Sequence, residues 1–315
     1  MITKWRLALS LLLAFGGTFE AKLEDHFKPC LSKSDLHKIR NIDFIYMINL
    51  DARPEKFESS LKQLLSYGIT PYRFSAVNGW DLPLEVINDV ALTYEPGMRT
   101  RNYGKKKLFG TSYLPENEGE PAHEPIHVPG KKYLCHCMSR GAVGIVLSHL
   151  SILQDAYDAG YQTIWVMEDD IRLIRNPHEL SDLIPHLDLL VGKENWDILF
   201  TDQDTKNQQG EYVPCKGHAI RPNFTPKNPR RFAERKIIGP FIQTGARFGA
   251  YSMIVRRSGM KKVLDFLKTY HIFFPYDMEM VLPHEIKLYT VKDDIVSTDP
   301  RAISDNGGPN YLKKY

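Results

Sequence analysis

Strong net charge and long apolar stretches are both missing from most of this 315-residue chain. The formal net charge is only +3, and the basic residues form no repeated stripe, so we expect no nucleic-acid partner. Beyond the N-terminus, no run approaches the ~20 apolar residues that a bilayer-spanning helix needs. The composition, 43% hydrophobic and 25% charged, is typical of one large globular domain or two small ones.

Several catalytic signatures are also absent. The chain has no Gly-x-Ser-x-Gly turn, no phosphate-binding loop, no Gly-x-Gly-x-x-Gly motif and no internal repeat. These absences exclude several hydrolase and dinucleotide-enzyme classes. A functional assignment must therefore come from other residues.

Cysteine is scarce, with only Cys30, Cys135, Cys137 and Cys215. An even number of cysteines in an exported chain permits disulfides. Cys135 and Cys137 flank a histidine, as in a zinc site, but no second cysteine pair matches them. The alternatives are a disulfide from this pair to Cys30 or Cys215, or buried thiols.

The N-terminus differs in kind from the rest. Lys4 and Arg6 precede the apolar run 7–15, small residues follow, and Ala21 is a candidate cleavage position. This pattern predicts that residues 1–21 are a secretory signal, or else an uncleaved segment that tethers the protein to a membrane surface. We therefore expect an exported or membrane-associated protein, or alternatively one at the cytoplasmic face of the inner membrane.

Strand and helix patterns alternate after a lead-in at residues 22–41. The predicted strands are 44–50, 72–77, 163–167, 196–200, 247–255 and 286–296. The predicted helices are 54–67, 141–159, 177–191 with a break at Pro185, and 259–270. The alternation predicts an α/β domain over residues 42–315 with a mainly parallel central sheet.

Two insertions interrupt this pattern. Near 95–132 a basic run is followed by an acidic, proline-broken one, which predicts a long loop or mobile lid. Near 203–240 a second irregular stretch is basic and contains prolines.

Three acids in a row, Glu168, Asp169 and Asp170, follow the apolar strand 163–167. In mainly parallel α/β sheets, ligands bind beyond the carboxyl ends of the strands. Adjacent carboxylates repel, and a divalent cation that also binds diphosphate oxygens would relieve the repulsion. The alternative is a solvated exit from the strand.

Other polar residues are predicted at the same edge. Asn49, Asp51 and Arg53 leave the first strand there, although Arg53 could equally be a solvated residue of the first helical turn. Ser148 and His149 lie on the helix that precedes the acidic strand. A histidine among apolar neighbours is also consistent with a core position.

Four sequence blocks, in this order and spacing, resemble glycosyltransferase family 25, which includes bacterial lipopolysaccharide and animal collagen galactosyltransferases. The blocks are Tyr46–Arg53, Tyr72–Gly79, Gly141–His149 and Met167–Asp170. The resemblance covers roughly residues 42–305. A later Pro-x-Asp block is similar to residues 275–277, but Met278 departs from the family pattern, and the next acid is Glu279.

The resemblance implies a GT-A-like fold, a UDP-sugar donor (usually UDP-galactose), Mn²⁺ or Mg²⁺, and inversion at the anomeric carbon. Asp170 would be the main metal ligand, Asp169 would assist, and Glu168 would contribute indirectly. Ser148 and His149 would brace the acidic strand or touch the donor. The residues that would line the nucleotide pocket are Asn49, Asp51, Arg53, Arg73 and Asn78.

Transfer to a hydroxyl of a glycan, a lipopolysaccharide or a protein would need a base on the far side of the donor sugar. Asp277 is the first candidate and Asp202, after the strand 196–200, is the second. Asp277 could instead hold a donor hydroxyl or end a helix. Two other functions remain open, a catalytically silent relative that binds sugar nucleotide or glycan, and a metal-dependent nucleotide-diphosphate hydrolase.

Overall fold

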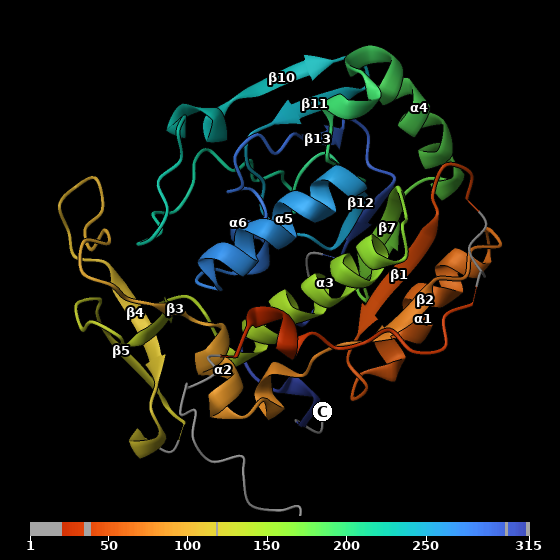
Figure 1. Ribbon diagram of the computed structural model, residues 1–315. Helices are drawn as coiled ribbons and strands as arrows, with labels where there is room; N and C mark the ends of the chain where they lie inside the picture. The colour runs from red at the N-terminus through yellow and green to blue at the C-terminus, as the bar shows by residue number, and fades with distance from the viewer. Residues whose placement is uncertain (1–20, 35–38, 118, 300–301, 313–315) are drawn as a thin grey trace, which may run out of the picture.

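The computed structural model describes residues 21–34, 39–117, 119–299 and 302–312 (Figure 1). The predicted signal or tether at 1–21 lies outside these residues, apart from Ala21. Within the described ranges, no helix is long and apolar enough to cross a membrane.

An eight-stranded sheet forms the centre of the domain, in the order β10-β11-β13-β9-β12-β7-β1-β2. Its strands are β1 (Phe44–Asn49), β2 (Tyr72–Ser75), β7 (Thr163–Glu168), β9 (Ile198–Phe200), β10 (Arg235–Ile238), β11 (Phe241–Thr244), β12 (Ser252–Arg256) and β13 (Leu288–Val291). β1 is parallel to β2 and β7, and β9 is parallel to β13. The other pairings are antiparallel. The predicted α/β class is confirmed, and the sheet is mixed.

Both faces of the sheet are covered by helices, which explains the apolar run of β1. Phe44, Tyr46 and Ile48 pack into one hydrophobic core, while Ile45 and Met47 pack into the other. The first core takes side chains from α2 (Leu84–Val90), α3 (Arg140–Asp158), α5 (Arg257–Tyr270) and α6 (Tyr276–Glu279). The second takes them from α1 (Pro54–Leu65) and α4 (Leu180–Val191). Figure 1 shows α3 and α5 side by side over the sheet.

Glycine allows α3 to touch the turn that follows β2. This turn is the short helix η2 (Gly79–Asp81), and Ser139 caps α3 by accepting a hydrogen bond from the Ala142 nitrogen at 3.0 Å. A Cβ at Gly144 would lie 2.5 Å from the Gly79 nitrogen, and one at Gly79 would lie 1.8 Å from the Arg140 oxygen. Only glycines permit this approach, which fixes the turn beside the carboxyl edge of the sheet.

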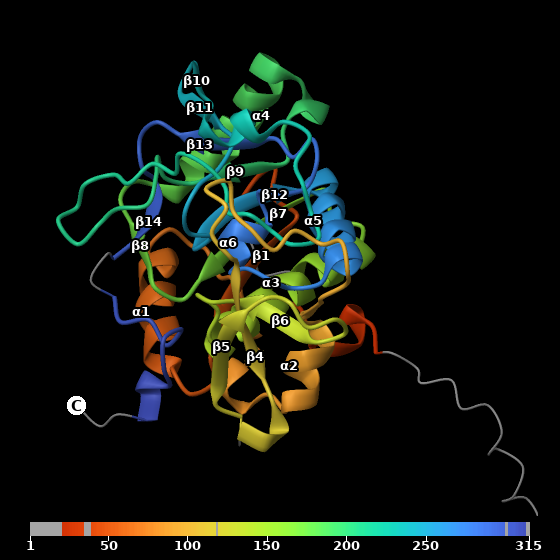
Figure 2. The same cartoon turned by 90° about the vertical axis from the view of Figure 1, so that its left-hand side faces the viewer.

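The first predicted insertion is not a structureless loop, so the loop interpretation was wrong, while the lid interpretation stays a prediction. A small antiparallel sheet, in the order β3-β6-β4-β5, stands beside the domain (Figures 1 and 2). Its strands are β3 (Leu92–Thr93), β4 (Phe109–Tyr113), β5 (Pro121–Pro125) and β6 (Lys132–Cys135). Two of the prolines that suggested a loop, Pro121 and Pro125, lie at the ends of β5, an edge strand, where a missing N–H is tolerated, and Pro115 begins a short 3₁₀ helix. Residues 95–108 remain irregular apart from an isolated bridge.

Two further boundaries differ from expectation. α4 continues through Pro185, because the Ser181 oxygen that a proline leaves without a partner accepts a hydrogen bond from Asn41 Nδ2 at 2.8 Å. The predicted strand at 247–255 begins only at Ser252, after Gly249 with its positive φ of 75°. The predicted strand at 286–296 divides into β13 and β14 (Val296–Thr298), which pairs with β8 (Ile171–Leu173). The second insertion is irregular as predicted, apart from a short 3₁₀ helix and β10.

The cysteine pairing also differs from expectation. Cys135 is bonded to Cys137, while Cys30 and Cys215 are free thiols. The predicted link from this pair to Cys30 or Cys215 is therefore wrong, and a disulfide removes the thiolates that the zinc interpretation required.

Candidate functional site

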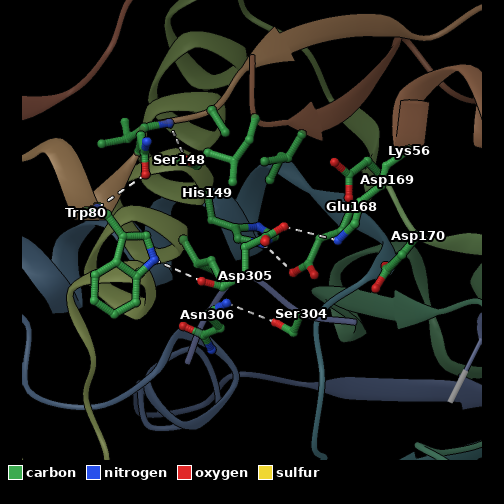
Figure 3. A pocket seen from close by; sticks show the side chains of 18 residues that line it. Lys56, Trp80, Ser148, His149, Glu168, Asp169, Asp170, Ser304, Asp305 and Asn306 are labelled. Atoms are coloured by element: carbon green, nitrogen blue, oxygen red, sulfur yellow. Dashed lines mark hydrogen bonds and ion pairs between the residues drawn. The ribbon is translucent and has the colours of Figure 1, made fainter. Parts of the chain in front are cut away.

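The predicted polar residues meet where β1, β2 and β7 end. Asn49 lies opposite Ser75, and Ile48 lies opposite Glu168 in the neighbouring strand. A cavity of about 90 Å³ opens at this edge (Figure 3). We call it the acidic pocket. Its lining includes Lys56, Trp80, Ser148, His149, Glu168, Asp169, Asp170, Ser304, Asp305 and Asn306.

Asp169 and Asp170 are the most perturbed carboxyl groups of this pocket. Asp169 accepts a hydrogen bond from Asn49 Nδ2 at 2.6 Å, yet burial raises its pKa to about 6. Burial, together with the charges of Glu168 and Asp169, raises the pKa of Asp170 to about 7. Asp170 Oδ1 is buried, and no group in the described part of the chain makes a hydrogen bond to it. The pocket therefore holds more negative charge than its own partners offset.

These oxygens fit a hard divalent cation that is shared with a ligand. Carboxylate oxygens are the donors that Mg²⁺ and Mn²⁺ prefer, and Asp170 Oδ1 is left without a partner. Within the described residues, however, no three acidic, histidine or cysteine side chains converge as a complete metal site. Asp170 and Asp169 could thus supply part of a coordination shell, and a ligand or water would have to supply the rest.

The sequence motif His-Glu-x-x-His occurs at residues 123–127 but does not form a metal site. In zinc proteases this motif lies on a helix, which brings both histidines to one face. Here His123 and Glu124 lie in β5. His123 Nδ1 lies 3.0 Å from Thr111 Oγ1, and Glu124 is ion-paired with Lys131.

His149 connects the acidic triplet to α6. Its Nε2 lies 3.2 Å from Glu168 Oε1, and its ring stacks on Tyr276 with centroids 4.0 Å apart and planes at 8°. The side chain is fully buried. His149 is therefore a core residue that also lines the acidic pocket, and its role toward a donor stays a prediction.

Ser148 braces the neighbouring turn. Its hydroxyl accepts a hydrogen bond from the Val77 nitrogen and donates one to the Gly144 oxygen, both at 2.8 Å. Ser148 thus ties the end of β2 to α3.

Three predicted nucleotide-pocket residues form one network. Arg73 donates to Asn49 Oδ1 at 2.7 Å and to Asp51 at 2.8 Å. The Ser75 hydroxyl, 2.6 Å from Asp51, and the Arg73 guanidinium hold the pKa of Asp51 below its usual value. Asp51 and Asn78 line an adjoining cleft of about 690 Å³.

The C-terminal segment 302–312 contacts the other two predicted nucleotide-pocket residues, Arg53 and Asn78. Arg53 forms an ion pair with Asp305, and Asn78 Nδ2 donates to the Tyr311 hydroxyl at 2.8 Å. Trp80 Nε1 donates to the Asp305 backbone oxygen at 2.9 Å. No motif or periodicity marked this segment in the sequence, so Asp305 was missed as a site residue.

Asp277 lies beside the acidic pocket. Its Oδ2 accepts a hydrogen bond from the Gly249 nitrogen at 2.8 Å. A cavity of about 170 Å³ is lined by both Asp277 and Glu168. Burial raises the pKa of Asp277, and the charge of Glu168 adds to the rise.

The other candidate acids have structural positions. Asp202 is buried, paired with Arg247 at 2.6 Å and hydrogen-bonded by the hydroxyls of Tyr251 and Ser297. It lines neither the acidic pocket nor the cavity beside Asp277. The structure thus does not place Asp202 where a base is needed. Glu279 is likewise buried and accepts hydrogen bonds from the Phe273 and Phe274 nitrogens at 2.8 Å.

An α/β sheet covered on both faces, with an acidic pocket at its carboxyl edge, defines a GT-A-like fold of the nucleotide-sugar-binding class. The profile of glycosyltransferase family 25 (LPS biosynthesis protein) matches residues 42–280, and the chain belongs to this family, as the sequence predicted.

Curated relatives carry the same family name. The "Inactive glycosyltransferase 25 family member 3" of Mus musculus is 25% identical over 169 residues, which cover 54% of this chain and 23% of the relative. A "Glycosyltransferase 25 family member" of Drosophila melanogaster is 23% identical over 189 residues, 60% of this chain and 25% of the relative. A relative of the same name from Aedes aegypti is 24% identical over 175 residues, which cover 56% of this chain and 23% of the relative. The chain thus spans about a quarter of the length of these relatives.

Proposed function

We propose that this glycosyltransferase is metal-dependent and inverting, and that it moves a hexose from a UDP-sugar to a hydroxyl group of a glycan, lipopolysaccharide or protein. The observation that carries the proposal is the buried Asp170 oxygen without a partner, within an acidic triplet at the carboxyl edge of the sheet. Galactose is the hexose that the family resemblance favours. The N-terminal pattern favours an exported or membrane-associated enzyme.

Asp170 and Asp169 would hold Mn²⁺ or Mg²⁺, and a bound cation would stabilise negative charge on the leaving diphosphate. The chain positions these ligands through neighbouring groups. Asn49 holds the Asp169 carboxylate, and the Ser60 hydroxyl donates to the Asp169 backbone oxygen at 2.7 Å. His149 orients Glu168 beside them.

Asp277 is the proposed base. It lies on α6, a different element from the triplet, and it shares with Glu168 a cavity beside the acidic pocket. The Gly249 N–H fixes one carboxylate oxygen, so that the other can accept the proton of the acceptor hydroxyl. A raised pKa strengthens a carboxylate as a base.

A catalytically silent protein is the second candidate, and two observations favour it. Some relatives are named inactive. In addition, the acidic pocket encloses about 90 Å³, whereas small-molecule sites usually enclose ~300–1,000 Å³. Because Asp305 lines this pocket, a donor that fills it would displace the segment that carries Asp305, and a silent member would keep this segment in place.

One assay separates these functions. Release of UDP from UDP-galactose is measured with and without a mixture of acceptor glycans, in Mn²⁺ and in excess chelator. A transferase needs both acceptor and metal, a hydrolase releases UDP equally without acceptor, and a silent relative releases none.

The variant Asp170→Asn should lose most transfer, whereas Asp265→Asn, the same change at an exposed position of α5, should not. Full activity of wild type in excess chelator would contradict metal dependence.

A further inference from the structure

A large cleft lies between the small sheet and residues 218–220, and the proposed mechanism does not use it. Its volume is about 720 Å³. Its lining includes Asn102, Lys107, Phe109, His123, His136 and His218. We call it the basic cleft.

The basic cleft is connected to the proposed base by a series of cavities. His218 and Ala219 line it and also line a cavity of about 400 Å³ that reaches Asp277. On its other side Asp277 lines the cavity that it shares with Glu168. A molecule in the basic cleft could therefore extend a group past His218 to Asp277, on the side away from the nucleotide residues.

Two of the stretches that contribute to the walls of the cleft contain no acidic residues. No Asp or Glu occurs between Glu95 and Glu116, or between Glu211 and Glu234. The first stretch contains the basic run 99–107, whose residues 105–107 are all exposed lysines. The Arg99 nitrogen donates to the Pro222 oxygen at 2.8 Å, which joins the two walls.

Positive charge is concentrated around His218. Burial lowers the pKa of His218, and the charges of Arg231 and Arg99 lower it further. Arg231 donates only to backbone oxygens, and Arg99 donates to the Arg101 oxygen. Glu234 is close enough to act on Arg231, but among the described residues neither arginine forms an ion pair with a carboxylate. The charges of Arg99 and Arg231 thus act on His218 from behind the lining of the cleft.

Aromatic rings complete the lining. Phe109 is 49% exposed at the cleft, and Phe273 and Phe274 also line it. Apolar rings with a few polar and charged groups are typical of a site that binds a small organic ligand. The C–H faces of a sugar ring pack on such rings. Lysine and arginine side chains form charge-assisted hydrogen bonds to carboxylate or phosphate oxygens.

We propose that the basic cleft is the acceptor site and that it binds an acidic saccharide, one that carries a carboxylate or a phosphate. This proposal rests on the proposed transferase function. Lys107 binds the anion, the charges of Arg99 and Arg231 add to the attraction near His218, and the saccharide extends a hydroxyl to Asp277. The hydroxyl oxygen then forms the new bond to the anomeric carbon of the donor, the bond from that carbon to UDP breaks, and Asp277 takes the proton.

The test compares three acceptors with UDP-galactose and Mn²⁺: a neutral disaccharide, its hexuronic acid form and its phosphorylated form. At least one acidic form should have a KM below that of the neutral form, and the two acidic arms show which anion is bound. Because Arg99 and Lys107 are outside the reacting centre, Arg99→Gln with Lys107→Gln should raise the KM of the acidic acceptor by about tenfold or more, with kcat little changed.

Lys236→Gln, which removes an exposed charge from β10, is the matched control and should leave this KM unchanged. The neutral acceptor should respond to neither variant. Equal KM values for all three acceptors, or an equal effect of the double variant on each, would overturn the proposal.

Direct binding of the three saccharides by calorimetry separates this proposal from the proposed function. If no transfer occurs but the acidic forms bind and lose affinity in the double variant, then the cleft is an acidic-saccharide site and the transferase proposal fails. If transfer occurs without preference for acid, only the acceptor proposal fails.

Discussion

Arg53 and Asp305 are joined by an ion pair in which one guanidinium nitrogen lies 2.7 and 2.5 Å from the two carboxylate oxygens. Lys56 Nζ lies 3.4 Å from the same carboxylate. The pair links the start of α1 to the C-terminal segment across the acidic pocket. Because this segment lines the pocket, which encloses only about 90 Å³, we expect the segment to control access to it.

Asp305→Asn should strengthen UDP binding. The substitution removes the carboxylate that holds Arg53, so opening the segment costs less and Arg53 is free to meet a diphosphate. We expect the Kd for UDP with Mn²⁺, measured by calorimetry, to fall several-fold. Arg53→Gln should instead weaken binding, because it removes the cation as well. Weaker binding in Asp305→Asn would show that Asp305 itself contacts the nucleotide.

Stability without metal should fall as pH rises. The pKa values of Asp169 and Asp170 in the folded protein are about 6 and about 7, above their ordinary value of 3.8. The folded state therefore binds protons more tightly than the unfolded state, and this contribution is lost as pH rises through about 7. Wild type in chelator should unfold at a lower urea concentration at pH 8 than at pH 5.

Asp170→Asn should reduce this pH dependence and stabilise the metal-free protein at pH 8, by on the order of 1–3 kcal/mol. Urea unfolding at both pH values measures the difference, and Asp265→Asn is the control. If Asp170→Asn and wild type lost the same free energy of unfolding between pH 5 and pH 8, this would contradict the raised pKa of Asp170. A variant that loses activity and gains stability would show that the acidic pocket is strained for function.

Local patterns predicted the centre of the site. The apolar runs of β1 and β7 bury both faces of the sheet, so their parallel pairing brings Asn49 and Glu168 to one edge. These relationships need only strand direction and residue spacing, which the sequence contains.

Long-range partners could not be predicted. Nothing in the sequence near Asp202 indicates that it forms an ion pair with Arg247. Likewise, nothing near Arg53 indicates its ion pair with Asp305. The small sheet was missed because its edge strand, β5, is charged and proline-bearing and lacks the apolar alternation of a covered strand. Pairing with β4 determines its structure, rather than its own propensity.

Asp202→Asn should destabilise the fold rather than act on catalysis alone. The substitution leaves the buried Arg247 without its ionised partner, which typically costs ~3–5 kcal/mol. The urea midpoint should therefore fall well below that of wild type. The double variant Asp202→Asn, Arg247→Met should recover part of the loss. A variant of wild-type stability but with strongly reduced kcat would restore Asp202 as a candidate base.

Asp277→Asn should suppress transfer while UDP binding stays near wild type. An asparagine oxygen can still accept the Gly249 hydrogen bond, so α6 should keep its position, but the amide cannot take a proton. A general base typically contributes ~10²–10⁴-fold, so kcat should fall by a factor in this range. The Kd for UDP with Mn²⁺ and the urea midpoint serve as controls. A loss of only a few-fold would reject the role of base. A large loss accompanied by equally weakened binding of the intact UDP-sugar would mean that Asp277 holds a hydroxyl of the donor, since it shares its cavity with Glu168.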